Sequence, residues 1–340
     1  MLPKISITIP TYNEKDNIRS CLESIQIQNY PEGKIEVIIV DGGSTDGTID
    51  ITRQFQFVTV LNNPEKDTHI GKMIGLKAST GEYWTYFDAD LQANGSDWAR
   101  SMVQPLLEDS ALVASVSRYH GRPEDSLLEK YINLDPIGRD TLFAWFTPGI
   151  ESTIEEWRNG YAVCCYQPNS IPPEGRCLFR RSLLMELIGH QGRFRELDTL
   201  LLLTRAGHAQ YAYVPEPGYY HRHPKSLSEL HRKRKRNAMR NYIPGYMEGY
   251  IQYTWFDLKM PKDFLKMSAL IFYAFSLIGP LFGGIWKTVK YRSLSGMVEV
   301  VYVPVAVKAY LEAVITNKQG RSFIKQVLKE FSWQRKRGYK

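Results

Sequence analysis

The sequence is poor in cysteine and lacks the patterns that make cysteine a metal ligand or a crosslink. Its 340 residues contain four cysteines, Cys21, Cys164, Cys165 and Cys177. None of them forms a Cys-x-x-Cys pair, so a zinc site is not indicated, and four cysteines are far too few for a secreted disulfide scaffold. We therefore expect reduced thiols in a cytosolic setting.

Targeting, repeat and nucleic-acid signatures are also missing. The chain enters an apolar strand at Ile5 without the basic and apolar regions of a signal peptide, so we expect the N-terminal domain to remain in the cytoplasm. It has no internal repeat, and the glycine-rich, arginine-containing N-terminal loop of sugar nucleotidyltransferases is absent. The formal charge of +7 and the pI near 9.0 fit a partner that carries phosphates or an anionic membrane surface. Nucleic acid is not expected, because no fold signature for it accompanies the charge.

Short apolar strands alternate with amphipathic stretches over about the first 220 residues. Between strands at 5–10 and 35–40, Ile18, Cys21, Leu22 and Ile25 recur at helical spacing. Further strands are expected at 57–61, 83–87, 112–116 and 211–214, and further helices after Asp46 and at 70–78, 97–107 and 197–206. Ordered segments are also expected at 177–179 and 183–188. The alternation predicts an α/β fold with a mainly parallel, Rossmann-like sheet, helices on both faces and ligands at the carboxyl ends of the strands. Residues 118–173 are expected to form an irregular helical insertion.

The strand at 83–87 ends in two carboxylates spaced one residue apart, Asp88 and Asp90. Residues i and i+2 of an extended strand point the same way, so both could reach one divalent cation that also binds phosphate oxygens. Taken alone, Asp-x-Asp at a strand end is also typical of a helix cap and turn. The segments upstream favour the metal, with a nucleoside diphosphate as its partner.

Those segments, in their order along the chain, resemble family 2 glycosyltransferases of the GT-A fold. They are residues 9–14, 40–48, 71–75, 81–83 and 88–90. The resemblance covers about residues 5–220 and implies an inverting enzyme that uses a nucleoside diphosphate sugar and a divalent metal, Mg or Mn. It implies a GT-A catalytic domain at 1–220, with a nucleotide-sugar half at 1–117 and an acceptor half at 118–220. It also implies that Pro10, Tyr12 and Glu14 line the nucleotide pocket.

Two further residues are candidates for the nucleotide sugar. Asp41, at the end of the second strand, could accept the imino N–H of uracil or guanine, or could be a turn residue before Gly42-Gly43. Lys72 could lie beside the diphosphate, where a cation lowers the cost of the developing charge, or could be a solvated surface lysine. Family members often have Arg-Asn where this chain has Lys72-Met73, which is a departure from the pattern.

Inverting transfer needs a base that takes the proton of the acceptor hydroxyl. Family members place an acidic pair before an Arg-Ala-Gly-like turn, and the turn at 205–207 puts Glu196 at the usual position of the base. Arg195 replaces the first acid of the pair, so Asp198 competes for this role. Alternatively, both acids only favour a helix N-terminus through its dipole.

Basic and imidazole side chains on either side of this segment are further candidates. His221 could complete the metal site, and His223 could touch a phosphate, although at least one of them is expected to be a lone surface histidine. Arg180 and Arg181 lie just before the base segment, where relatives bind the acceptor, and could meet an acceptor phosphate.

The last third of the chain differs in composition. Residues 231–236 form a dense basic run, and aromatic residues follow from 242 to 256. Segments at the surface of an anionic bilayer have this composition, so we expect interfacial helices at 221–262. A solvated helix is the alternative.

An apolar, membrane-associated segment and a basic tail are expected at 263–340. Residues 268–286 lack charge and are bounded by Lys266 and Lys287. Because glycine and proline interrupt them at 279–280 and 283–284, a re-entrant or interfacial hairpin is favoured over a buried core helix. A pair of spans using 297–315 is another alternative, but the charges at 299, 308 and 312 favour an amphipathic helix there.

The sequence therefore predicts a metal-dependent, inverting glycosyltransferase at the cytoplasmic face of a membrane. It would move a sugar from a nucleoside diphosphate donor to a hydroxyl of a lipid-linked glycan or other membrane-proximal acceptor in the synthesis of a surface polysaccharide. One alternative is a polyprenyl-phosphate sugar synthase, whose acceptor phosphate needs no strong base. Another is a catalytically inactive membrane scaffold that binds nucleotide, which the replacement of an acid by Arg195 slightly supports.

Overall fold

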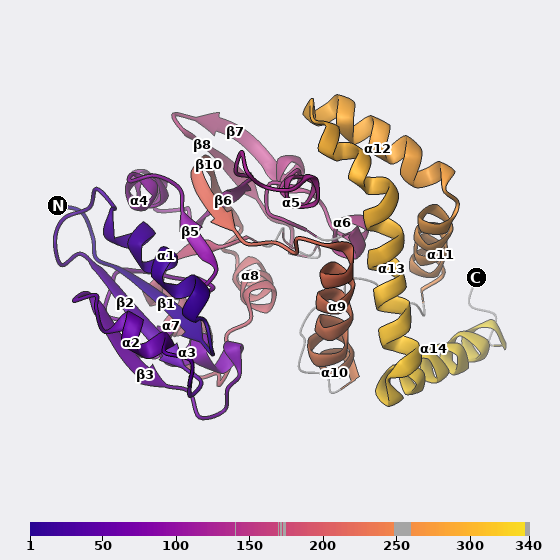
Figure 1. The fold of residues 1–340 in the computed structure, drawn as a ribbon, viewed down its shortest axis with the longest axis horizontal. Helices are drawn as coiled ribbons and strands as arrows, with labels where there is room; N and C mark the ends of the chain where they lie inside the picture. The colour runs from indigo at the N-terminus through magenta and orange to yellow at the C-terminus, as the bar shows by residue number, and fades with distance from the viewer. Residues whose placement is uncertain (140, 169, 171, 173–174, 248–259, 337–340) are drawn as a thin grey trace. The chain divides into compact units, whose positions relative to one another are not determined.

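The computed structural model describes residues 1–139, 141–168, 170, 172, 175–247 and 260–336 (Figure 1). The chain divides into two compact units. The first contains residues 1–120, 136–138 and 148–222, and the second contains residues 121–135, 139–147 and 223–340.

A ten-stranded sheet organises the first unit, in the order β3-β2-β1-β4-β9-β6-β10-β8-β7, with β5 paired to β10. The strands are β1 (Ile5–Thr11), β2 (Ile35–Asp41), β3 (Val58–Asn62), β4 (Tyr83–Tyr86), β5 (Leu91–Ala93), β6 (Ala114–His120), β7 (Ile154–Arg158), β8 (Tyr161–Cys165), β9 (Cys177–Arg180) and β10 (Gln210–His221). From β3 to β4 the strands are parallel, as the alternation predicts. Beyond β4 the sheet is mixed, because β9 runs antiparallel to β4 and β6, whereas β6 and β10 are parallel.

Most helices of the first unit lie at the predicted positions. The helices are α1 (Lys15–Gln26), α2 (Thr48–Thr52), α3 (Thr68–Ala78), α4 (Trp98–Glu108), the 3-10 helix η1 (Ile150–Thr153), α7 (Arg181–Ile188) and α8 (Glu196–Arg205). The four apolar residues that share a face of α1 are all buried. Helix α3 lies directly on β1, because a Cβ atom on Gly75 would come within 2.1 Å of the Thr8 Cγ2 atom.

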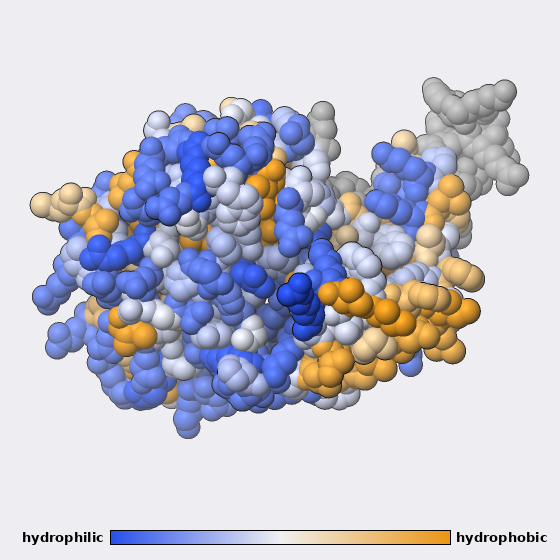
Figure 2. Space-filling model, turned by 90° about the horizontal axis from the view of Figure 1, so that it is seen from above, coloured by the Kyte–Doolittle hydropathy of each residue, from blue (hydrophilic) through white to orange (hydrophobic). Residues whose placement is uncertain are grey.

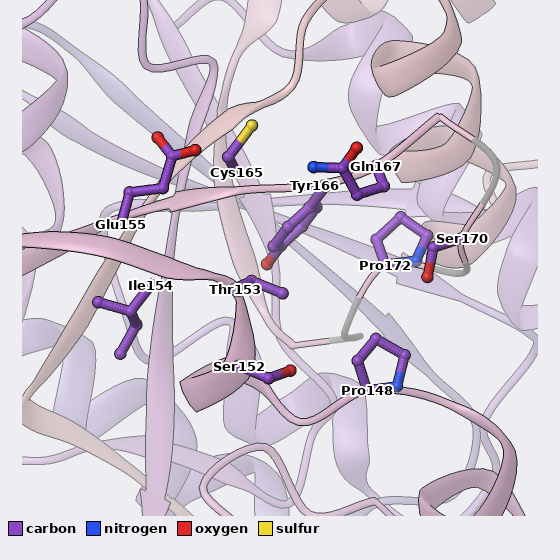
Figure 3. Close-up of a pocket in the computed structure, with 10 residues that line it drawn as sticks. All are labelled: Pro148, Ser152, Thr153, Ile154, Glu155, Cys165, Tyr166, Gln167, Ser170 and Pro172. Atoms are coloured by element: carbon purple, nitrogen blue, oxygen red, sulfur yellow. The ribbon is translucent and has the colours of Figure 1, made fainter.

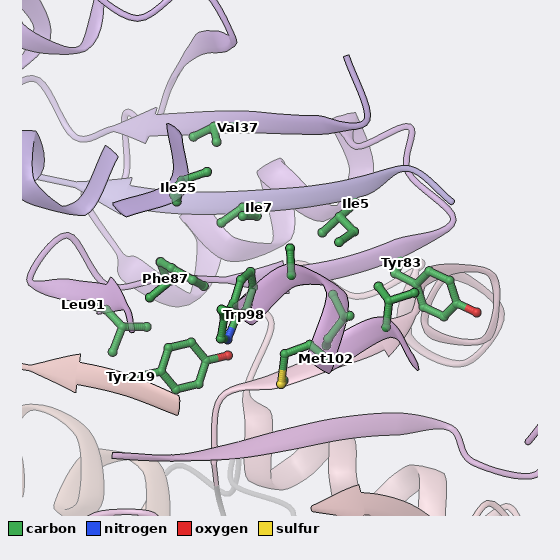
Figure 4. Close-up of a cluster of buried hydrophobic side chains, with 14 of the residues drawn as sticks. Ile5, Ile7, Ile25, Val37, Tyr83, Phe87, Leu91, Trp98, Met102 and Tyr219 are labelled. Carbon is green, nitrogen blue, oxygen red and sulfur yellow. The ribbon is translucent and has the colours of Figure 1, made fainter. Parts of the chain in front are cut away.

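Aromatic packing fixes the end of β4 relative to the end of β10 (Figure 4). The rings of Phe87, Trp98 and Tyr219 contact one another, with ring centroids 5.1 Å apart for Phe87 and Trp98 and 5.6 Å apart for each of the other two pairs. Phe87 immediately precedes Asp88, and Tyr219 stands two residues before His221. The core therefore fixes the backbone just before Asp88 and just before His221.

The expectation of an irregular helical insertion at 118–173 is wrong in part. Strand β6 continues to His120, and β7 and β8 form an antiparallel hairpin that joins the sheet through β10. Four of the five residues of β7 are exposed, so this edge strand carries no apolar alternation that a sequence reading could detect. Two short helices do occur in this range, α5 (Leu127–Ile132) and α6 (Thr141–Phe146), and both belong to the second unit.

The second unit is helical in the residues that the structure describes. Besides α5 and α6 it contains α9 (Leu227–Asn237), the π-helix η2 (Ala238–Tyr242), α10 (Ile243–Met247), α11 (Pro261–Phe275), α12 (Ile278–Tyr291), the 3-10 helix η3 (Leu294–Val298), α13 (Glu299–Thr316) and α14 (Lys318–Lys336). The amphipathic helix expected at 297–315 is α13, which buries Tyr302, Val303 and Ala306 among other residues. Of the predicted interfacial segment, residues 248–259 lie outside the described part of the chain.

The long apolar segment is broken, but at 276–277 rather than at the predicted 279–280 and 283–284, because both of these pairs lie inside α12. Helix α11 ends at Phe275, α12 begins at Ile278, and Leu277 between them has a φ of 59°. Among the described residues, no helix taken alone has the length and apolar character to cross a membrane. Helices α11 and α12 meet both criteria together, but they are bent by 85° at the break.

Candidate functional site

Two carboxylates and an imidazole converge beyond the end of β4. Asp88 and Asp90 follow that strand directly, and the antiparallel pairing of β10 with β5 sets His221 opposite Leu91. One ligand atom from each of the three side chains lies within 4.8 Å of the other two, and the His221 Nε2 atom is 3.4 Å from the Asp90 Oδ1 atom. Oxygen ligands with one imidazole nitrogen suit Mn²⁺ and tolerate Mg²⁺. The structure thus brings together the three residues predicted to hold a metal.

Arg176 joins this cluster, and the sequence reading missed it. Its Nη2 atom donates to Asp88, its Nη1 atom donates to the Tyr86 hydroxyl at 2.9 Å, and Nη1 lies 3.4 Å from the Glu196 Oε2 atom. Arg176 precedes β9, and the antiparallel pairing of β9 with β4 brings it to Asp88. No local pattern in the sequence predicts the pairing of β9 with β4.

The cations around Asp88 keep it ionised. Burial raises the pKa of the Asp88 carboxyl, but the charges of Arg176, Lys72 and His221 outweigh burial and hold the pKa well below its usual value. A metal ligand must be deprotonated, so this environment prepares Asp88 for that role.

Glu196 is buried at the start of α8 with its carboxylate beside the same arginine. It accepts hydrogen bonds from the Tyr86 hydroxyl and from the backbone N–H of Cys177 at 3.3 Å. Burial raises the pKa of Glu196, and the charge of Arg176 and the bond from Tyr86 reverse only part of this rise. A carboxylate with a raised pKa is a better proton acceptor at neutral pH. Asp198, its competitor, is also buried in the first turn of α8.

Lys72 is buried in α3, so the alternative of a solvated surface lysine is wrong. Its Nζ atom lies 3.6 Å from the centroid of the Tyr86 ring, and the Arg176 guanidinium lies 4.8 Å from the same centroid. One aromatic ring therefore contacts two cations beside the carboxylates of Asp88 and Glu196.

The predicted nucleotide residues lie at the carboxyl ends of β1 and β2. Asp41 organises the turn that follows it, because its carboxylate accepts from the backbone N–H groups of Gly43 at 2.9 Å and Ser44 at 2.8 Å. Pro10 stands opposite Val40 in the β1–β2 pair, next to this turn.

Two other predicted pocket residues differ in their exposure. The Tyr12 ring is half-exposed, with the Lys66 Nζ atom 5.1 Å from its centroid. The pKa of Glu14 is raised by burial and, more weakly, by Asp90 and Asp88, so Glu14 is electrostatically coupled to the proposed metal ligands.

The structure does not bring the predicted phosphate-binding arginines to this cluster. Because β9 runs antiparallel to β4, Arg180 stands opposite Tyr83 at the beginning of β4, whereas Asp88 follows its end. Arg180 donates to backbone carbonyls of Leu106, Asp109 and Leu112, and Arg181 donates to the Ser79 hydroxyl at 2.8 Å. Both line a separate pocket of about 410 Å³ at that end of the strand.

His223 and a further pocket also lie apart from the cluster. The His223 ring lies 2.8 Å from the Asn133 side-chain oxygen, and both residues belong to the second unit. A pocket of about 250 Å³ lies in the first unit, and Figure 3 shows the residues that line it. Its lining consists of Pro148, Ser152, Thr153, Ile154, Glu155, Cys165, Tyr166, Gln167, Ser170 and Pro172. It includes none of the clustered residues, so we do not place the donor there.

Several known proteins are similar to the chain. Over 94 residues it is 36% identical to "Glycosyltransferase AglE" of Haloferax volcanii, and this match covers 26% of this chain and 31% of that protein. Over 91 residues it is 34% identical to "Dolichyl N-acetyl-alpha-D-glucosaminyl phosphate 3-beta-D-2,3-diacetamido-2,3-dideoxy-beta-D-glucuronosyltransferase" of Methanococcus voltae. This match covers 25% of this chain and 28% of that protein. The matched region thus spans about a third of the length of these relatives.

Among solved structures, a mannosyltransferase of Pyrobaculum calidifontis in complex with GDP-Man and Mn²⁺ has a TM-score of 0.48 and 20% identity, over 98% of this chain and 87% of that one. The Staphylococcus aureus protein TarS, residues 1–349 in complex with UDP, has a TM-score of 0.47 and 14% identity, over 92% of each chain.

The profile described as "Glycosyl transferase family 2" matches residues 6–188. This range contains Asp41, Lys72, Asp88, Asp90 and Arg176 and ends before Glu196. The match covers more than half of the chain and confirms the resemblance drawn from the ordered motifs. The protein belongs to glycosyl transferase family 2.

Proposed function

We propose that the protein transfers a sugar from a nucleoside diphosphate donor to a hydroxyl group, with a divalent metal, Mg or Mn, as cofactor. The observation that carries the proposal is that three groups of side chains lie close together past the end of β4. These are the candidate ligands Asp88, Asp90 and His221, the cations Lys72 and Arg176, and the carboxylate of Glu196. Each has a role in inverting transfer.

The three candidate ligands fit the cofactor by donor type, by spacing and by the ionised state of Asp88. When bound there, a divalent metal neutralises charge on the diphosphate of the donor. Lys72 and Arg176 add positive charge beside the same carboxylates, so they would stabilise the diphosphate as it leaves the anomeric carbon.

Glu196 would accept the proton of the acceptor hydroxyl while the oxygen forms its bond to the anomeric carbon and the bond to the diphosphate breaks. Its raised pKa supports this assignment. Asp198 remains the competitor, because it lies buried in the same turn of α8.

We also propose that the acceptor is lipid-linked or close to a membrane, at its cytoplasmic face, in the synthesis of a surface glycan. The name of the Methanococcus voltae relative describes a transferase that acts on a dolichyl-phosphate-linked sugar. The basic run and the apolar α11–α12 pair of the second unit support a membrane location.

A thermal-shift screen of UDP, GDP, CMP and TDP sugars, with and without Mn²⁺, tests donor and metal together. We expect one class of donor to raise the melting temperature only with the metal, and Asp88→Asn and Asp90→Asn to abolish the shift. Asp50→Asn, at an exposed position of α2, is the matched control and should keep it. If no nucleotide sugar stabilises the protein or turns over with metal present, the proposal fails.

Variants of the two acids distinguish this proposal from its alternatives. With a hydroxyl acceptor, Glu196→Gln or Asp198→Asn should abolish transfer while the donor still stabilises the protein. Retained transfer in both variants would indicate a phosphate acceptor and hence a polyprenyl-phosphate sugar synthase. Stabilisation by nucleotide without any metal-dependent turnover would indicate a binding scaffold.

A further inference from the structure

Helix α12 directs its large apolar side chains to solvent and its small residues to the protein. Six exposed residues recur at spacings of three and four: Ile278, Leu281, Phe282, Ile285, Trp286 and Val289. The buried residues of this helix are Pro280 and Gly284, and a Cβ atom on Gly284 would lie 3.3 Å from the Gly296 carbonyl oxygen. A helix of a water-soluble domain normally shows the opposite arrangement. The outer face of α12 is therefore built for an apolar environment.

The neighbouring elements extend this face. Helix α11 exposes Phe264, Leu265, Phe272 and Phe275, the turn exposes Leu277, and η3 exposes Leu294 and Met297. Within the part of the chain that the structure describes, 13 of the 23 exposed large hydrophobic side chains fall between residues 264 and 297. Figure 2 shows hydrophobic residues gathered on one side of the second unit. Patches of this kind mark interaction surfaces, and we call this one the apolar face.

Charge at the edges of the apolar face indicates what it contacts. Lys262 and Lys266 stand at the start of α11, and Lys290 and Arg292 stand at the end of α12 and just beyond it; all four are exposed. Asp263 is the one acidic residue of these two helices. A positive rim around an apolar centre complements a bilayer with anionic headgroups. A second copy of the chain would instead bring rims of the same sign together.

The lengths of the helices limit how deep they can reach. Helix α11 has 15 residues and α12 has 14, so each is roughly 21–22 Å long, against about 30 Å for the hydrocarbon core of a bilayer. The 85° bend prevents them from acting as one straight span. Both helices therefore suit the outer part of a single leaflet.

We propose that α11, the turn at 276–277 and α12 form a monotopic membrane anchor, which inserts its apolar face into one leaflet of an anionic bilayer without crossing it. This inference rests on the membrane location proposed above and specifies the surface, the lipid charge and the depth. It does not depend on the transfer chemistry, so binding rather than turnover tests it.

The test is co-sedimentation of the full chain with vesicles of phosphatidylcholine, with or without phosphatidylglycerol. We expect binding that requires phosphatidylglycerol. The double variant Phe272→Glu with Phe282→Glu should weaken it by about tenfold or more, because two exposed rings no longer enter the leaflet. The matched control, Ile27→Glu with Leu107→Glu, changes two exposed apolar residues of the first unit and should bind like the wild type.

A second variant keeps the test decisive if the glutamate substitutions disturb folding. Lys262→Gln with Lys290→Gln leaves every apolar side chain in place and should weaken binding to anionic vesicles, an effect that added salt should mimic. Wild-type binding that is absent, or that neither variant weakens relative to the control, overturns the proposal. So does a wild-type dimer in sedimentation equilibrium that Phe272→Glu with Phe282→Glu dissociates, because the apolar face would then be a subunit interface.

Depth is measured with Trp286, which lies on the exposed side of α12. Its fluorescence, taken as the difference between the wild type and Trp286→Phe, should be quenched more by lipids brominated near the headgroup than by lipids brominated at the chain end. Stronger quenching at the chain end would indicate a span and would contradict a single-leaflet anchor.

Discussion

Replacing Arg176 by methionine removes the guanidinium but keeps much of the length and apolar volume of the side chain. Two carboxylates lose the guanidinium beside them in this variant, those of Asp88 and Glu196. Breaking a buried ion pair by deleting one partner costs about 3–5 kcal/mol. The Arg176 side chain is 16% exposed and that of Asp88 is 29% exposed, so solvent screens part of the effect. We therefore expect a loss of about 2–3 kcal/mol in the free energy of unfolding at pH 7.5.

The loss should also depend on pH. In the wild type the pKa of Asp88 is depressed, so its contribution to stability is present above the unfolded value of 3.8 and is lost only in stronger acid. Without Arg176 the pKa values of Asp88 and Glu196 should both rise. The folded variant then binds more protons than its unfolded chain, and its stability falls as the pH rises. The difference between wild type and variant should thus grow from pH 5 to pH 7.5.

Urea unfolding followed by circular dichroism, with a chelator present so that no metal replaces the lost charge, measures both effects. Arg158→Met is the matched control, because Arg158 contacts Asp109 at 2.7 Å and Glu156 at 2.6 Å but is 36% exposed. An exposed pair of this kind contributes about 0–1 kcal/mol. If the two variants lose equal stability, or if the Arg176→Met loss is the same at pH 5 and pH 7.5, the reasoning about the buried cation is wrong.

Two other substitutions test local contacts, and the first of them also removes the hydroxyl that accepts from Arg176 Nη1. Tyr86→Phe removes a hydrogen bond to the Glu196 carboxylate that is worth about 1.5–3 kcal/mol, so the acid limb of the pH–rate profile should move up by about one to two units. The control is Tyr166→Phe, which removes a buried hydroxyl without a hydrogen-bond partner among the described residues and should not shift the acid limb of the pH–rate profile. If Tyr86→Phe does not shift this limb either, Glu196 is not the base. Gly75→Ala should cost about 1–3 kcal/mol in urea unfolding through overpacking, and Gly192→Ala, whose added Cβ meets nothing within 4 Å, should cost less. Equal losses would contradict the close approach of α3 to β1.

Local patterns predicted the parts of the fold that local sequence determines. The strands from β1 to β4 are apolar runs that end in turns, so their ends and the position of Asp88 followed from spacing. The position of His221 after the strand at 211–214 made it a candidate third ligand, but spacing did not decide between a metal ligand and a surface histidine. What could not be predicted depends on pairings between distant segments. The antiparallel placement of β9 carries Arg176 toward the cluster and Arg180 away from it, and neither residue differs from its neighbours in any local pattern.

Prediction from the sequence was also incomplete for the apolar segment. Composition and the glycine and proline positions predicted a hairpin interrupted at 279–284, whereas the break lies at 276–277 and α11 and α12 are bent by 85° there. Composition could not say which face of α12 would be buried, because this face depends on the approach of Gly284 to η3. The outward direction of the large side chains is a tertiary property.

The candidate metal ligands come from segments that a ribosome delivers at very different times. Asp88 and Asp90 emerge early, Arg176 emerges later, and His221 follows last with the strand that must pair with β5. During synthesis, the arginine is thus available to Asp88 before the histidine is. Under the proposed function, the divalent metal site is therefore complete only after His221 has left the exit tunnel and its strand has paired with β5.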